Sequence, residues 1–182
     1  IGVGAVGVGA YGRVVGGSAA SPVPVDLCPG PVRARLFRGQ LLAALVPLRL
    51  GPPLVSMVLY LPAADFSGIF LHVSRLAWHT QDMLADARVS LLVAADEDSA
   101  QSLLALARVS LQGLAQQLGP DSPDLSGLRA AYLARFPDAE QMFGFADFSV
   151  FLIRPDSARF VAGFGQAHSL SRESLIQLLR RS

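Results

Sequence analysis

The residues with the clearest chemical potential lie where an apolar run ends and a helical pattern begins. Ser74, Arg75, His79 and Thr80 cluster at this predicted strand-to-helix junction. A phosphate group needs positive charge and several hydrogen-bond donors, and such a junction supplies backbone N–H groups together with a helix N-terminus. Arg75 carries a permanent charge, and the hydroxyl and imidazole groups add further donors. The pattern therefore predicts a phosphate-binding loop, although each residue taken singly is also typical of a solvated turn or a helix cap.

The sequence contains no other arrangement that is typical of catalysis. It has no Gly-x-Ser-x-Gly elbow, no Walker loop, no paired-histidine metal spacing and no dinucleotide fingerprint. The glycines at positions 2, 4, 7 and 9 imitate a glycine-rich loop, but no predicted strand precedes them. Cys28 is the only cysteine, which excludes an intrachain disulfide and a cysteine metal cluster.

The composition predicts a globular chain without a nucleic-acid or membrane partner. Of the 182 residues, 52% are hydrophobic and 16% are charged, so most of the chain should pack. The 15 basic residues are all arginine, and the formal net charge is only +1, which gives no clustered basic charge for nucleic acid. Every apolar run is interrupted before it reaches the length of about 18 residues that a membrane span needs. We expect a cytoplasmic protein.

The order of predicted elements favours one α+β domain after an irregular arm. Residues 1–31 are rich in Gly, Ala, Val and Pro, and we interpret them as an arm, with the folded domain at residues 32–182. Alternation and apolar runs predict strands at 40–48, 54–61, 69–74, 88–95, 108–118, 148–153 and 159–164. Gly113 interrupts the fifth of these as a bulge or a close approach of the backbone, and residues 155–157 are predicted to form a turn.

Helical patterns occupy the gaps between these strands. Helices are predicted at 78–85, 125–136, 139–145 and 172–181, with Trp78, Met83 and Leu84 on a buried face and Ser171 as a cap of the last helix. Antiparallel strands with helices packed at the rim give an α+β barrel.

Six segments together resemble the FMN-binding split β-barrel family that is related to pyridoxamine 5'-phosphate oxidase. The densest is FLHVSRLAWHTQDMLADARVSLLVA at 70–94, which is similar to the haem-utilisation branch of that family. The others are at 53–60, 108–113, 132–137, 144–148 and 162–167. The resemblance implies an antiparallel split β-barrel, an FMN cofactor and a homodimer. Because the six segments occur together in the same order, they favour a cofactor site over the interpretation of each residue as part of a turn or a helix cap.

The resemblance also implies roles for individual residues. The phosphate of FMN would lie against Ser74, Arg75, His79 and Thr80. The flavin ring edge would lie along Ser56, Met57 and Val58, and the ribityl chain or ring would approach Arg108 and Gln112. One departure is Asp82, which stands where the family usually has Asn and adds a negative charge near the expected phosphate.

Three functions stay open on the sequence alone. The first is an FMN-dependent oxidoreductase that acts on an unknown small-molecule substrate. The second is a haem-binding or haem-degrading protein of the same fold, with His168 as the iron ligand, because related haem-utilisation proteins carry such a histidine near the C-terminus. The third is a cofactor-free binding module, which Asp82 favours. His72, the remaining histidine, is interpreted as a core or rim residue of its strand.

Overall fold

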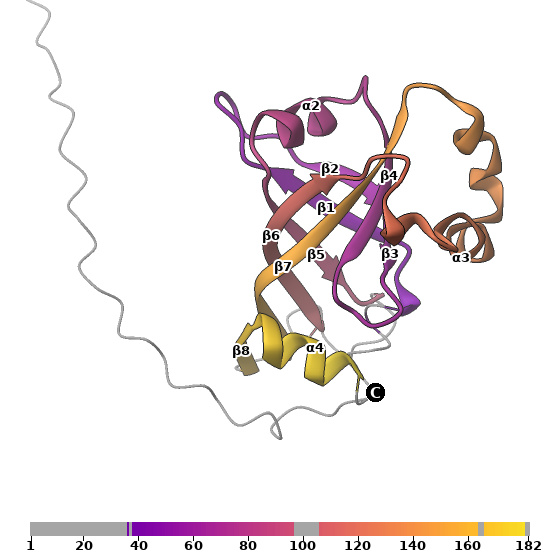
Figure 1. The fold of residues 1–182 in the computed structure, drawn as a ribbon. Coiled ribbons are helices and arrows are strands. Elements are labelled where there is room, and N and C mark those ends of the chain that lie inside the picture. Colours follow the sequence, from indigo (N-terminus) through magenta and orange to yellow (C-terminus); the bar gives the residue numbers. More distant parts are fainter. Residues whose placement is uncertain (1–35, 37, 97–105, 164–165, 181–182) are drawn as a thin grey trace, which may run out of the picture.

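The protein is built on one curled antiparallel sheet (Figure 1). The computed structural model describes residues 36, 38–96, 106–163 and 166–180, and the predicted arm at 1–31 lies outside them. The elements, in chain order, are β1 (Leu42–Pro47), β2 (Ser56–Leu59), β3 (Leu61–Pro62), β4 (Ile69–Ser74), α2 (Trp78–Ala85), β5 (Arg88–Ala94), β6 (Arg108–Gln117), the 3-10 helix η4 (Pro123–Leu125), α3 (Leu128–Arg135), the 3-10 helix η5 (Pro137–Gly144), β7 (Phe148–Gly163), β8 (Gln166–Ser171) and α4 (Arg172–Arg180).

The sheet has eight strands in the order β2-β1-β5-β6-β7-β4-β3, and β8 pairs with β7 away from this path. Side chains alternate between its faces, as β5 illustrates: Val89, Leu91 and Val93 are buried, whereas Arg88 and Leu92 are exposed. The inward-facing residues of the long strands form one core cluster inside the curl. This arrangement confirms the predicted α+β split barrel.

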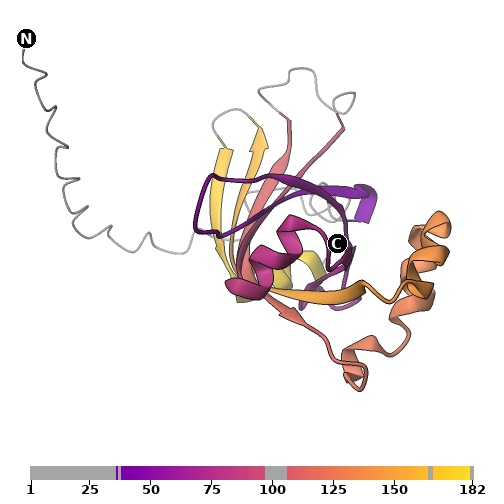
Figure 2. The same ribbon diagram turned by 90° about the horizontal axis from the view of Figure 1, so that it is seen from above.

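Two helices cover the two ends of the curled sheet. Seen from above, α2 lies over one end and α4 over the other, whereas α3 and η5 lie outside the strands (Figure 2). The helix α2 buries Thr80 and Met83, and α4 buries Leu175. The Ser171 hydroxyl accepts a hydrogen bond from the Ser174 amide at 3.3 Å, which confirms the predicted cap. Among the described residues, no helix combines the length and apolar character that a membrane crossing needs.

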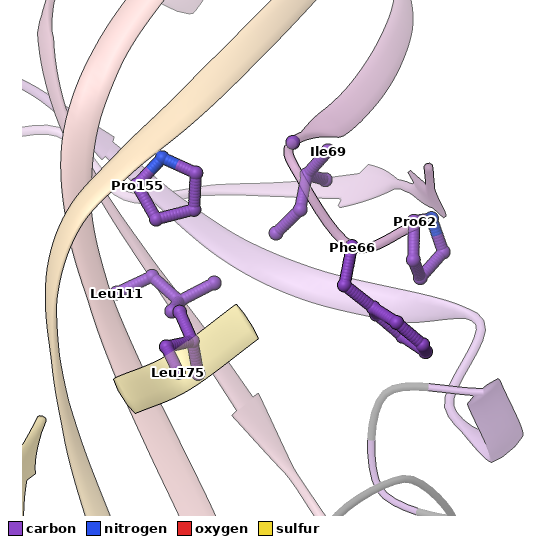
Figure 3. Close-up of a pocket in the computed structure, with 7 residues that line it drawn as sticks. Pro62, Phe66, Ile69, Leu111, Pro155 and Leu175 are labelled. Carbon is purple, nitrogen blue, oxygen red and sulfur yellow. The ribbon is translucent and has the colours of Figure 1, made fainter. Parts of the chain in front are cut away.

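A small apolar cavity lies beneath α4 (Figure 3). It is lined by Pro62, Phe66, Gly68, Ile69, Leu111, Pro155 and Leu175. Its volume is about 10 Å³, roughly the space that one water molecule needs, and its walls offer no polar side chain.

The outer face of β4 and β7 is covered by the segment from η4 to η5. Phe70 packs with Leu128 and Leu152, and Tyr132 packs with Phe136 and Ala139. The two helices predicted at 125–136 and 139–145 lie in this segment, but the first is shorter and the second is a 3-10 helix.

Two features of the C-terminal half differ from the sequence prediction. The predicted turn at 155–157 is wrong, because β7 runs unbroken from Phe148 to Gly163 with a register shift opposite Gln112 and Gly113. Pro155 has no N–H to donate, and a bulge is a place where a strand tolerates proline. β8 was missed, since QAHSLS lacks the apolar alternation of a strand. On α2, Trp78 and Leu84 were predicted to be buried with Met83, but they are 67% and 49% exposed.

Gly113 is required by the close approach of β7 at this bulge. A Cβ atom at position 113 would lie 2.2 Å from the carbonyl oxygen of Arg154. Backbone atoms cannot shift at low energetic cost. A side chain at position 113 would therefore force β6 and β7 apart at the bulge.

We expect Gly113→Ala to lower the free energy of unfolding by about 1–3 kcal/mol, the usual cost of overpacking. Gly119→Ala is the matched control, because nothing lies within 4 Å of a Cβ at that position, and it should change stability by less than about 0.5 kcal/mol. Chemical denaturation measures both. Equal stabilities of the two variants would show that the close approach imposes no constraint.

Candidate functional site

The loop between β4 and α2 is held by the chain that follows η5. The Ser74 hydroxyl donates to Asp147 Oδ2 at 2.6 Å and accepts from the Leu76 amide at 3.1 Å. The Arg75 amide donates to the Asp147 carbonyl at 2.6 Å, and Arg75 Nη2 donates to the Ala146 carbonyl at 3.0 Å. The hydroxyl and the guanidinium predicted to bind phosphate are therefore engaged within the chain, beside a carboxylate that would repel an anion.

The two predicted donors on α2 face inward. Thr80 is fully buried, and within the described ranges its Oγ1 atom has no hydrogen-bond partner. His79 Nε2 is also buried without a partner there. Burial lowers the pKa of His79, against the opposing effect of Asp82, so the imidazole is neutral near pH 7. The structure thus brings Ser74, Arg75 and these two residues into one loop and helix, but not as an open cradle for phosphate.

Asp82 has a cationic partner that the sequence did not indicate. Arg49, just after β1, lies 3.6 Å from the Asp82 carboxylate, and both side chains are largely buried. The Arg49 guanidinium also lies over the Trp78 ring, 5.2 Å from its centroid. Beside this pair, the surface is apolar, since Leu76 is 80% exposed and Trp78 is exposed as well. The charge of Asp82 is neutralised within the chain.

The three residues predicted to line a flavin ring divide between the two faces of β2. Ser56 pairs with Leu45 and Val58 pairs with Ala43, so both point toward the barrel interior. Met57 points outward and is 73% exposed.

Arg108 and Gln112 lie on the same outer face as Met57, but on β6. Three strand-to-strand steps of about 4.8 Å separate β2 from β6 in the sheet, or roughly 14 Å. Arg108 Nη1 donates to the Leu106 carbonyl at 3.1 Å, and Gln112 Oε1 accepts from the Ser157 hydroxyl at 3.3 Å. The structure therefore does not gather the predicted flavin-ring residues around one spot.

His168 lies on β8, which within the described residues pairs with β7 alone. It pairs with Phe160, which is buried, so the His168 ring is on the interior face of the sheet. Its Nε2 atom is buried and has no hydrogen-bond partner among the described residues.

Sequence reasoning missed the aromatic cluster around His72. The imidazole stacks on Phe143 with 4.2 Å between ring centroids, and Phe148 and Tyr132 lie at 5.1 and 5.8 Å. Burial lowers the pKa of His72 and raises the pKa of Tyr132 to about 12. Neither His72 Nδ1 nor the Tyr132 hydroxyl has a hydrogen-bond partner in the described structure. The signal in the sequence was the density of aromatic residues between 132 and 148.

A family model described as the CREG beta-barrel matches residues 50–177, which is well over half of the chain. The chain belongs to the CREG beta-barrel family. The predicted likeness to split barrels related to pyridoxamine 5'-phosphate oxidase, and to their haem-utilisation branch, is confirmed.

Three relatives of this CREG-family chain are named after haem. The chain is 40% identical over 117 residues to the chloroplastic non-canonical haem oxygenase HOZ of Arabidopsis thaliana, covering 64% of this chain and 34% of HOZ. It is 28% identical over 113 residues to the haem oxygenase HutZ of Vibrio cholerae, covering 62% of this chain and 64% of HutZ. The structure of a haem-binding protein from Mycobacterium smegmatis matches with a TM-score of 0.70 and 29% identity, covering 82% of this chain and 60% of that one.

These findings correct the predicted cofactor and function. An FMN-dependent oxidoreductase was the first prediction, and it is wrong, because the relatives are named as haem oxygenases and a haem-binding protein. The loop geometry gives a physical reason, since its phosphate donors are either bonded within the chain or buried. The haem alternative agrees with the relatives.

The His72 cluster makes stability depend on pH. Because the folded pKa of His72 lies below the unfolded value of about 6.5, the unfolded state takes up protons first as pH falls, and stability is lost below that value. We expect His72→Phe to flatten the fall in unfolding free energy between pH 7.5 and 5.5. The same variant should keep the stability of the wild type at pH 7.5, since it removes a buried nitrogen without a partner. Urea denaturation at both pH values measures this, and parallel pH profiles would contradict it.

Proposed function

We propose that this protein binds haem. The observation that carries the proposal is the 40% identity over 117 residues to HOZ, a protein named as a haem oxygenase. Two features support it: imidazole nitrogens that have no hydrogen-bond partner in the part of the chain that the structure describes, and exposed apolar surface next to arginine side chains.

His168 is the axial ligand that we propose. A neutral imidazole nitrogen is a common ligand of haem iron. Three rings enclose His72, and His79 Nε2 is turned inward beside the paired Asp82, so neither leaves room for a planar macrocycle. His168 instead lies on a strand that is paired on one side only. Because His168 Nε2 is buried, we expect the start of β8 to move away from β7 when iron binds.

We further infer that the bound haem is degraded, the activity in the names of HOZ and HutZ. The chain spans about a third of HOZ and less than two thirds of HutZ, so their whole activity is carried over here as a proposal. Loss of the haem absorbance under air with an added reductant measures it. The cytoplasmic location stays a prediction, since HOZ is named as chloroplastic.

Replacing the ligand should change the haem spectrum. We expect the wild type to develop a sharp Soret band on titration with haemin, and His168→Ala to lose or shift that band. His79→Gln is the matched control, because it removes another partly buried imidazole and should keep the band. A spectrum of His168→Ala that is identical to the wild type would reject His168 as the ligand.

We also propose that the protein is a homodimer. Side chains on the outer face of β1, β2 and β5 are apolar and unusually exposed: Leu42, Val46, Met57 and Leu92. A contiguous apolar patch on this scale is typical of an interaction surface, and a second copy of the chain would cover it.

Light scattering at micromolar concentration should give twice the chain mass of 19.2 kDa. Met57→Lys, which puts a charge into the patch, should shift the mass toward that of the monomer. Leu84→Lys is the matched control, since Leu84 is 49% exposed on α2 and lies outside the patch. A monomeric wild type would refute the dimer.

A further inference from the structure

The segment from η4 to η5 (residues 123–144) packs on the barrel as a separate layer. Its apolar residues form two clusters of their own, one around Leu128 and one around Tyr132 and Phe136, apart from the core cluster inside the curl. In the view from above, α3 and η5 lie outside the strands (Figure 2). Units of one protein open with different free energies, so a peripheral layer can open while the barrel stays folded.

His72 lies at the contact between this segment and the barrel. It shares the outer face of β4 with Phe70, which packs against Leu128. The imidazole stacks on Phe143 of η5, with 4.2 Å between the ring centroids and 23° between the ring planes. It meets Tyr132 of α3 edge-on, with 5.8 Å between the centroids. Both α3 and η5 therefore rest on the His72 ring.

No acidic side chain of the described structure is placed to balance a charge on this ring. Neither β4 nor the facing part of β7, residues 148–153, contains an acidic or basic residue apart from His72. The charged groups on or next to the other packed elements are Arg129 and Arg135 on α3, Asp138 and Glu140 on η5, and Asp147 before β7.

Most of these groups are engaged elsewhere. Arg129 binds Glu140 at 3.1 Å, and Asp147 accepts a hydrogen bond from the Ser74 hydroxyl at 2.6 Å. Arg135 donates to the Arg38 carbonyl at 2.7 Å, and Asp138 is exposed. Burial lowers the pKa of His72, and no described charge opposes this effect.

Protonation of His72 is therefore unfavourable while the segment is closed. An imidazolium carries an N–H on both ring nitrogens, and the Nδ1 atom is buried without a hydrogen-bond partner among the described residues. A buried charged donor without an acceptor costs far more than a buried neutral nitrogen. Water hydrates the imidazolium once the segment opens, so the open form binds the proton more tightly. By linkage, the closed form loses stability as pH falls below the ordinary histidine pKa of about 6.5.

We propose that the η4–η5 segment is an acid-responsive flap, which protonation of His72 releases from the outer face of β4 and β7. Release uncovers Phe70 and Leu152, which are buried in the neutral form. Gly119 and Gly144 flank the segment in open space, since nothing lies within 4 Å of a Cβ at either position, and the chain can pivot there. This inference does not depend on the proposed haem binding.

Hydrogen exchange measured by mass spectrometry at pH 7.5 and 5.5 tests the flap, with protection factors corrected for the intrinsic exchange rate at each pH. We expect the protection of α3 and η5 to fall severalfold at pH 5.5. The upper limit is about tenfold, because an open-state pKa of about 6.5 couples no more strongly than that over this range. The strands β5 and β6 should keep their protection.

Two variants and a control assign the effect to the His72 ring. His72→Phe keeps an aromatic ring for the stack, and His72→Leu removes the same nitrogens with a smaller side chain. Both should abolish the dependence on pH, so a packing defect in one of them does not decide the result. His79→Gln is the matched control, because it removes another imidazole whose pKa burial lowers, and it should keep the dependence.

Every other result counts against the flap. Equal protection of α3 and η5 at the two pH values in the wild type would overturn it, and so would stronger protection at pH 5.5, which would mean that the rings stabilise the imidazolium. A loss of protection that persists in both His72 variants would reject His72 as the sensor. A loss of equal size in β5 and β6 would show unfolding of the whole barrel instead of release of one segment.

Discussion

The long strand β7 is the constraint on which the other features depend. Its 16 residues pair with β4, β6 and β8, so this one strand sets the register of three others. In its first half, Phe148 contacts the His72 ring and Val150 packs in the cluster of Phe70 and Leu128; in its second half, Arg159 points outward and Phe160 inward. The bulge opposite Gly113 lets the strand bend through both halves without a turn. Without that bend, the loop before α2 and the strand that carries His168 would not belong to one barrel.

The charges and hydrogen bonds of the loop before α2 explain why a sequence pattern that resembles an FMN-phosphate loop does not form an open phosphate site here. The Ser74 hydroxyl donates a hydrogen bond to Asp147, Arg75 binds the Ala146 carbonyl, and Asp82 pairs with Arg49. Asp147 therefore places a negative charge beside Arg75, and Asp82 is already paired, so the loop disfavours a phosphate.

Much of the fold follows from local sequence. The strand at 69–74 and the helix at 78–85 have the predicted bounds, because alternation and helical spacing are strong there. The continuity of β7 could not be predicted from the local sequence, since Pro155 and Asp156 usually mark turns. Here they form a bulge, because β7 stays paired with β6 on both sides of them. The strand β8 was not predicted because most of its residues are polar. Within the site, the contacts of Arg49 with Asp82 and of Asp147 with Ser74 could not be predicted, because each joins residues that are far apart in the sequence. The FMN prediction was wrong because the residue types at a strand-to-helix junction do not show which hydrogen-bond donors are already bonded within the chain.

The most direct test of the account is a titration of the purified wild-type protein with haemin and, separately, with FMN at the same micromolar concentrations. We predict a saturable Soret band with haemin at one site per chain or one per dimer. FMN fluorescence should stay that of the free flavin, because the phosphate donors of the loop before α2 and of α2 itself are either bonded within the chain or buried. Quenching of FMN at stoichiometric protein, together with haemin absorbance that matches free haemin, would contradict the central claim.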